Sequence, residues 1–452
     1  MFVRYAWLTA RSPWSRDYGE GCVLGMAQLL AERGSYFPRL HDYPYLVANY
    51  PPVFVAAVAA GQKAFGPSLA FPRLLGLLAT IGILVVLFLL LRRLLRDAAT
   101  ALALAAVFAV PWFVTTWAAL GRVDTTAILF SLAGLAVVLR HGPTARAWPA
   151  LLLFWLAFFT KQNAVLAPAA LAVDLLLARD RRLGRAALAY ALPLAALFGL
   201  LVLATQGEAW RHLVPYTAAA IYEPGRMGLA YLHLGVIASP LLVAILAALV
   251  AVPGAFALGA GRVLLVYFLL NLANLATIAK AGAAQNYFLE PWAATLLLAG
   301  FALRALADRR PRVWRWRWAA LLLAGAVARH AYPSLDRLPQ ALRAPEKARE
   351  FPALVRLIRE TPGDVLSENL SLLVVNDRPV LLEPFGVFLI AREGLLSTDR
   401  LTADCQRGRF PLVIVEHRMW EIPGFGDCLA SRYQPAGDYG PYKALRPRLS
   451  SR

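Results

Sequence analysis

The sequence predicts a polytopic α-helical membrane protein of about ten spans, with a small C-terminal α/β domain outside the membrane. Of its 452 residues, 59% are hydrophobic and 16% are charged, and the mean hydropathy is +0.56. A soluble domain is usually nearer half apolar and a quarter charged. Polarity rises after about Leu335. We therefore expect a membrane domain over residues 1–334, with an outer first loop over 11–70, and a soluble domain over 335–452.

Ten apolar segments are candidate spans, because a helix needs roughly 20 predominantly apolar residues to cross a bilayer. They are residues 72–91, 100–118, 124–140, 149–160, 163–178, 186–205, 231–251, 262–279, 286–304 and 317–333. The pair 149–160 and 163–178 is short for two full spans. It forms either one long helix with a break or two helices that meet below the membrane surface.

Orientation follows from the uneven distribution of arginine between the loops. Alternate loops contain arginine clusters, such as Arg92–Arg96 and Arg304–Arg317. The other short loops hold only Arg122, Lys161, Arg211, Arg226 and Lys280. Cytoplasmic loops carry the excess of Lys and Arg, so the clusters are cytoplasmic if 149–178 counts as two crossings. This accounts for the net charge of +19 without a nucleic-acid partner.

The same assignment predicts an inner (cytoplasmic) membrane protein whose C-terminal domain is extracytoplasmic. It also places the N-terminus outside, although MFVRYAWLTARSP, residues 1–13, is too short and too polar to span. Either a short tail crosses unaided or a further helix precedes it, and we favour the second expectation.

The region after Leu335 alternates helical and strand patterns. A helix is expected over 343–361, and strands over 364–369, 378–383 and 410–417, which together predict an α/β domain. Cys405 and Cys428 could pair there if the domain lies outside the cytoplasm. The triplet Asn369-Leu-Ser371 matches a glycosylation sequon, a pattern that is common by chance.

The first outer loop opens with two carboxylates, Asp17 and Glu20, in SRDYGEG. A solvated turn would explain them, as would a catalytic carboxylate at the membrane surface. AQLLAERGSYFPRL, residues 27–40, follows as an expected amphipathic helix. An apolar interfacial segment over 47–68 then contains Asn49 and Tyr50.

Three further polar clusters fall on the same predicted outer face. Asp124, with Arg122 nearby, begins a span, where a carboxylate also suits the helix dipole. Lys161 lies at a helix break with Gln162, and it either snorkels to the interface or offers donors to phosphate oxygens. The run Lys280–Glu290 ends a loop and starts a span. In this run Asn286 and Tyr287 suit an interfacial anchor, whereas Glu290 is costly unless paired or hydrated.

These pieces occur in an order that resembles a known superfamily. An acidic residue in the first outer loop is followed by an amphipathic stretch, N-Y-P-P at 49–52, F-G-x-S at 65–68 and R-L-L at 73–75. Over residues 15 to about 330, the set resembles the GT-C integral-membrane glycosyltransferases. It is most similar to bacterial relatives of protein O-mannosyltransferases and lipid A aminoarabinose transferases. The resemblance implies transfer of a sugar, with inversion, from a polyprenyl-phosphate donor to a lipid, glycan or protein hydroxyl outside the cytoplasm.

The resemblance, together with the chemistry of the side chains, implies a role for each candidate. Asp17 is expected to be the general base, and Asp124 to orient the acceptor or share a proton network with Asp17. Lys161, with Arg122 or Lys280, is expected to offset charge on the departing phosphate. Glu20 is expected to support the site. The remaining candidate substrate-binding residues are Asn49, Tyr50, Gln162, Asn286, Tyr287 and Glu290.

Two expectations concern what the protein does not use and what else it could be. The sequence contains no metal-ligand motif, so we expect neither a metal nor another cofactor. A multi-span transporter or flippase of lipid-linked sugars is the alternative function. Such folds commonly contain repeated broken helices, and the sequence shows no repeated pair of segments. Polar clusters on one face favour one-sided chemistry.

Overall fold

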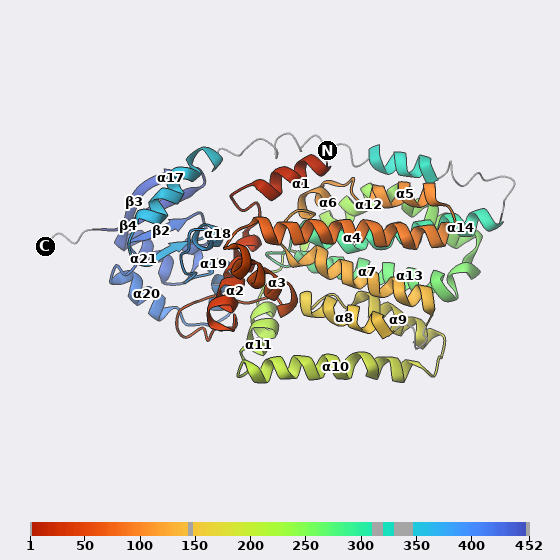
Figure 1. Ribbon diagram of the computed structural model, residues 1–452, viewed down its shortest axis with the longest axis horizontal. Helices are drawn as coiled ribbons and strands as arrows, with labels where there is room; N and C mark the ends of the chain where they lie inside the picture. Colours follow the sequence, from red (N-terminus) through yellow and green to blue (C-terminus); the bar gives the residue numbers. More distant parts are fainter. Residues whose placement is uncertain (1, 143–147, 310–319, 330–346, 449–452) are drawn as a thin grey trace.

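The computed structural model describes residues 2–142, 148–309, 320–329 and 347–448. Figure 1 shows a bundle of long helices at one end and a small domain with a sheet at the other. Helices α2 (Tyr18–Arg33) and α3 (Pro52–Phe65) lie where the two parts meet. The domain boundary expected near residue 335 falls outside the described residues.

Six helices of the described chain are long and apolar enough to cross a membrane, so this is a multi-pass membrane protein. They are α4 (Ala70–Leu95), α7 (Val123–His141), α10 (Leu183–Ala204), α12 (Pro224–Ala251), α13 (Gly259–Leu275) and α14 (Leu289–Arg309). α14 is the most buried of them, whereas α10 has no buried residue and presents its apolar side chains outward. Six of the ten predicted spans are thus confirmed as long helices, and the count of ten is not.

The other predicted spans form shorter helices. Segment 100–118 divides into α5 (Ala98–Val107) and α6 (Trp112–Trp117), because Pro111 lacks the N–H that a continuous helix needs. Segment 149–178 divides into α8 (Trp148–Thr160) and α9 (Leu166–Leu177), with Lys161 at the break. Of segment 317–333, only the helix Ala320–Arg329 is described.

The arginine-rich loops gather at one end of the bundle. The Arg93 guanidinium donates to the Arg140 carbonyl, joining the last turn of α4 to the end of α7. At the start of α13, Arg262 forms an ion pair with Asp174 of α9 at 2.6 Å. The charge asymmetry that the sequence shows is therefore also an asymmetry between the two ends of the bundle.

The first loop folds differently from the expected amphipathic helix over 27–40, and that prediction is wrong in its bounds. α1 (Phe2–Arg11) comes first, and α2 then begins at Tyr18, directly after its N-cap Asp17, and ends at Gly34 with a φ of 72°. Most of α2 is buried, since it packs between α3 and the C-terminal domain. Because α2 is covered on both sides, its apolar residues are not confined to one face and the helix is not amphipathic.

A buried ion pair joins the first loop to the bundle. Arg73 of α4 and Glu20 of α2 lie 2.7 Å apart, and neither side chain is exposed. The remaining Arg73 N–H groups reach the carbonyls of Thr9, Ser12 and Trp14. Glu20 also accepts from the backbone N–H groups of Arg16 and Gly121. One pair of side chains thereby fixes α1, the start of α2, α4 and the loop before α7.

The C-terminal domain contains a four-stranded sheet in the order β1-β2-β4-β3. Its strands are β1 (Val365–Ser367), β2 (Leu412–Val415), β3 (Tyr433–Tyr439) and β4 (Tyr442–Pro447). β1 and β2 are parallel, and β4 is antiparallel to both β2 and β3. The helices of the domain are α17 (Lys347–Glu360), α18 (Leu370–Val374), α19 (Pro384–Arg392), α20 (Asp399–Gln406) and α21 (Phe425–Arg432).

The strand expected over 378–383 is wrong. That segment forms one isolated parallel bridge, between Leu382 and Tyr45 of the first loop, and lies outside the four-stranded sheet. The helix expected over 343–361 and the strands expected over 364–369 and 410–417 correspond to α17, β1 and β2. The hairpin of β3 and β4 was not predicted.

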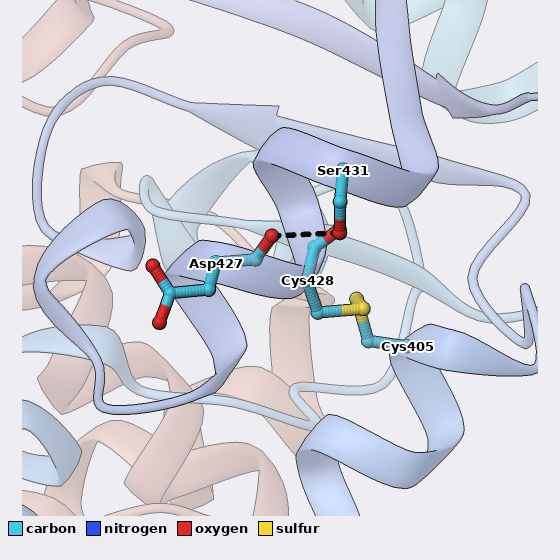
Figure 2. Close-up of a disulfide and its surroundings, with 4 residues drawn as sticks. All are labelled: Cys405, Asp427, Cys428 and Ser431. Carbon is cyan, nitrogen blue, oxygen red and sulfur yellow. Dashed lines mark hydrogen bonds between the residues drawn. A yellow bond between two sulfur atoms is a disulfide. The ribbon is translucent and has the colours of Figure 1, made fainter.

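A disulfide joins Cys405 of α20 to Cys428 of α21, with the two Cα atoms 6.3 Å apart (Figure 2). The pairing that the sequence left open is thus present in the fold. Both cysteines are buried in the core under the sheet, whereas Cys22 is a buried free thiol in α2.

Replacing Glu20 by Gln should lower the free energy of unfolding by about 3–5 kcal/mol, because Arg73 would keep a buried charge without its partner. Thermal unfolding of the purified protein in detergent measures the change. Glu421→Gln is the matched control, since Glu421 and Arg418 form a partly exposed pair that should contribute no more than about 1 kcal/mol. An equal loss of unfolding free energy in the Glu20 and Glu421 variants would contradict this role for Glu20.

Reducing agent should lower the stability of the C-terminal domain by about 2–4 kcal/mol, because the disulfide closes a loop of 23 residues. The double variant Cys405→Ser/Cys428→Ser should start from the lower stability and respond no further to reductant. Unfolding of both proteins, with and without reductant, tests this. A wild-type protein that is insensitive to reductant would show that the cross-link contributes nothing.

Candidate active site

The candidate residues meet where three parts of the membrane domain approach the first loop. These parts are the N-terminus of α7, the turn between α8 and α9, and the short 3-10 helix η5 (Gln285–Phe288) before α14. Asp17, as the N-cap of α2, faces them from the first loop. The polar clusters that the sequence placed on one face therefore converge on one region.

A chain of alternating charges runs through this region. Asp17 Oδ1 lies 2.6 Å from Arg122 Nη1, Arg122 Nε lies 3.7 Å from Asp124 Oδ2, and Asp124 Oδ1 lies 2.7 Å from Lys161 Nζ. Asp124 is buried, while about a quarter of the Asp17 side chain is exposed. Each charge has an opposite neighbour, which offsets the cost of removing it from water.

Neutral side chains complete the network. Asn286 donates to Asp124 at 2.7 Å, and Arg122 donates to the Tyr50 hydroxyl at 2.9 Å. Lys161 Nζ lies 4.8 Å from the centre of the Tyr287 ring, within the range of a cation–π contact.

The backbone is also tied to this network. Gln162 in the turn between α8 and α9 donates to the Asn49 carbonyl of the first loop at 3.1 Å. These contacts join the turn, η5 and the first loop around the charged chain.

The Asp17 carboxylate is shaped by its own helix and by Arg122. Asp17 Oδ1 accepts from the Gly19 N–H at 3.0 Å, as N-cap side chains do. Burial raises the pKa of Asp17 above its usual range, and the Arg122 guanidinium opposes that shift. A Cβ at Gly19 would lie 1.2 Å from Arg122 Nη1, so a larger residue there would displace the guanidinium from its present position.

Two cavities adjoin the charged chain. A small cavity of about 30 Å³ is lined by Asp124, Lys161, Asn163, Asn274, Tyr287 and Glu290, among others. A larger, more open cavity of about 370 Å³ is lined by Arg16, Asp17, Trp117, Arg226 and Gln285, among others. Asp17 thus faces the larger cavity, and Asp124 and Lys161 face the smaller.

Two of the predicted site residues, Glu20 and Lys280, line neither cavity. Glu20 is buried in its pair with Arg73. Lys280 donates to the Thr217 carbonyl and holds the loop before η5. Glu290 lines the small cavity, where Tyr267 and Ser131 donate to it at 2.7 and 3.1 Å. Hydroxyl donors therefore support this carboxylate inside the bundle.

Some residues of the site were missed or given little weight by the sequence. Arg16, which directly precedes Asp17 in the sequence, borders the larger cavity and was not among the predicted site residues. Arg226 also borders it, and its guanidinium reaches the carbonyls of Lys280 and Ala283. Asn274 is a polar side chain inside an apolar segment, and that pattern was a usable signal.

The C-terminal domain brings three metal-ligating side chains together, Glu368, Glu416 and His417. Glu368 already accepts from the backbone N–H groups of His417, Arg418 and Met419. Its carboxylate therefore closes a turn, and we assign no metal to this group.

Solved structures that resemble this protein over nearly its whole length include two structures of one enzyme. The crystal structure of ArnT from Cupriavidus metallidurans in the apo state aligns with a TM-score of 0.62 and 14% identity, over 98% of this chain and 96% of that chain. The same protein bound to undecaprenyl phosphate aligns with a TM-score of 0.66 and 15% identity, over 99% and 98%. The chain has the fold of ArnT.

The ArnT-like fold extends over the bundle, the first loop and the C-terminal domain, because almost all of both chains is aligned. The resemblance that the sequence showed is thereby confirmed at the level of the fold. No protein family matches the sequence, and neither does a curated protein.

Replacing Lys161 by Met should destabilise the protein by about 3 kcal/mol, because Asp124 would lose its closest cation. The double variant Lys161→Met/Asp124→Asn should be more stable than the sum of the single changes predicts, by about 0.5–3 kcal/mol. Thermal unfolding of all four proteins measures this coupling. Lys63→Met, at an exposed position of α3, is the control. Additive effects would show that Lys161 and Asp124 are not coupled.

Proposed function

We propose that this protein is a membrane glycosyltransferase that moves a sugar from a polyprenyl-phosphate carrier to an acceptor hydroxyl, with inversion at the sugar carbon. The observation that carries the proposal is the partly exposed Asp17 carboxylate, held against Arg122 at the wall of a cavity that two further arginines border. The fold shared with an ArnT structure bound to undecaprenyl phosphate supports a carrier of that class.

In the proposed reaction Asp17 accepts the proton of the acceptor hydroxyl as its oxygen attacks the anomeric carbon. The bond between that carbon and the phosphate oxygen breaks, and the electron pair leaves with the carrier phosphate. A positioned base of this kind typically contributes 10²–10⁴-fold. Arg122 and Lys161 would offset the charge that develops on the phosphate, and Arg16 and Arg226 provide further cations at the larger cavity.

The small cavity suits a hydroxyl group of the sugar or of the acceptor rather than a whole ring, because its volume is about 30 Å³. Its polar lining offers the carboxylates of Asp124 and Glu290 and the amides of Asn274 and Asn286, which together can accept and donate hydrogen bonds to hydroxyls. We propose that Asp124 orients the group bound there. Tyr50, Gln162 and Asn49 hold the first loop against this region. Glu20 would support the site indirectly, by its pair with Arg73. Lys280 would do so by holding the loop before η5.

The site is proposed to face the outside of the inner membrane. The disulfide between Cys405 and Cys428 suits an oxidising compartment, and the arginine-rich loops gather on the bundle end that would face the cytoplasm. Both features support the proposal that the C-terminal domain and Asp17 lie on the extracytoplasmic side.

Asp17→Asn should lower transfer from a labelled polyprenyl-phosphate sugar by about 10²–10⁴-fold, while binding of undecaprenyl phosphate persists. In the wild type, the rate should fall as the pH drops through the raised pKa of Asp17, because only the ionised carboxylate accepts a proton. Asp42→Asn is the control, since Asp42 is an exposed carboxylate of the same loop paired with Arg400. Wild-type transfer by Asp17→Asn would remove Asp17 from the base role, and carrier movement without transfer would favour a flippase.

A further inference from the structure

We propose that the C-terminal domain positions the catalytic carboxylate, with Glu383 and Asn369 acting on Asp17 through its neighbours Tyr18 and Ser15. The inference rests on the proposed role of Asp17 as the base. Glu383 and Asn369 belong to the C-terminal domain and touch neither cavity. They are therefore positioning residues.

The first anchor is the Tyr18 hydroxyl. It donates to Glu383 and accepts from the Phe385 N–H at 3.1 Å. Glu383 is itself fixed, because it caps α19 by accepting from the Gly386 N–H at 2.9 Å. The rings of Tyr18 and Phe385 also meet edge to face, 6.0 Å apart. The residue directly after Asp17 is thus bound at the start of a helix of the other domain.

The second anchor is the Ser15 hydroxyl, which donates to Asn369 Oδ1 at 3.0 Å. Asn369 is held in place by Ser371, which donates to the same oxygen at 2.7 Å, and by Tyr442 of β4, which accepts from its amide nitrogen at 3.0 Å. These contacts also explain the Asn369-Leu-Ser371 triplet. Its asparagine is nearly buried and its amide is occupied, so the triplet serves the interface between the domains.

The domain that carries both anchors is tightly docked on α2. A Cβ added at Gly21 would lie 2.8 Å from the Ser371 backbone nitrogen, so α2 and α18 approach at backbone distance. Tyr45 of the first loop also exchanges backbone hydrogen bonds with Leu381 and Glu383. Asp17 is therefore carried by a segment fixed to the C-terminal domain, whereas its partner Arg122 belongs to the membrane bundle.

The contact between Asp17 and Arg122 therefore depends on the docking of the C-terminal domain as well as on the Arg73–Glu20 pair. Other charged groups also act on Asp17 or share its cavity. They are Glu20, Asp124, Arg16 and Arg226. If an anchor is lost, the Asp17 carboxylate can move from Arg122 while it remains largely buried. Its pKa then rises further, because burial favours the neutral form and the closest cation no longer opposes it.

The test compares Tyr18→Phe with Tyr43→Phe. Tyr43 also belongs to the first loop and donates to the C-terminal domain, at Asp404, over 3.0 Å. Both variants lose one hydroxyl from the same interface, but only Tyr18 adjoins Asp17. Ser15→Ala, with Ser15→Thr as the variant that keeps the hydroxyl, tests the second anchor without altering an aromatic ring.

Tyr18→Phe should lower kcat for transfer from a labelled polyprenyl-phosphate sugar by about 10–100-fold, with little change in the KM for the donor. The acidic limb of its pH profile should move to higher pH, and hydrogen exchange over residues 15–21 should become faster. Ser15→Ala should act in the same direction, Ser15→Thr should restore activity, and Tyr43→Phe should keep the wild-type profile.

The inference is overturned if Tyr18→Phe and Ser15→Ala match Tyr43→Phe in kcat, pH profile and hydrogen exchange. Failure of the proposed function looks different. The wild type would then transfer no sugar, or Asp17→Asn would transfer as well as the wild type, while exchange over residues 15–21 would still respond to the anchors.

Discussion

The buried pair of Arg73 and Glu20 is the interaction on which the rest of this structure depends. Its two side chains bind backbone groups of α1, the segment before α2, and the loop before α7. Glu20 lies three residues after Asp17, and Gly121 directly precedes Arg122. The pair therefore fixes the backbone next to both Asp17 and Arg122, and so helps to bring these two residues into contact. A buried pair of this kind contributes little net stability when intact but is costly to break, so its value here is to select one arrangement.

The candidate site, next to the cavities, also consists of largely buried charges that are paired with opposite charges. Its charges alternate from Asp17 to Lys161, so each one is offset before any ligand binds. Such an arrangement can stabilise a developing charge without reorganisation, because its dipoles and charges are already oriented. Of the two carboxylates in this row of charges, Asp17 is the partly exposed one, and it faces the larger cavity. The network thus places the proposed base, Asp17, at the cavity wall, next to charges that are already paired with one another.

Both domains contact Asp17, the proposed base, or the residues beside it. The bundle supplies Arg122, Asp124 and Lys161, whereas the C-terminal domain binds the side-chain hydroxyls of Ser15 and Tyr18, on either side of Asp17. The disulfide strengthens the core that lies under this interface. None of the described residues of the C-terminal domain lines either cavity, so its proposed effect on the site acts through Ser15 and Tyr18.

The sequence by itself predicted the membrane class, the positions of six long helices and a small α/β region near the C-terminus. Hydropathy and charge are local properties of the sequence, so helix positions that depend on them can be predicted without knowledge of the tertiary structure. Asp17, Arg122, Asp124, Lys161 and Asn286 were expected on one face, and they meet. Only the tertiary structure decided that Glu20 serves Arg73, that 378–383 bridges the first loop, and that Glu383 reaches Tyr18. These contacts join residues up to 365 positions apart, and side-chain partners at such separations are chosen by packing, which no local pattern encodes.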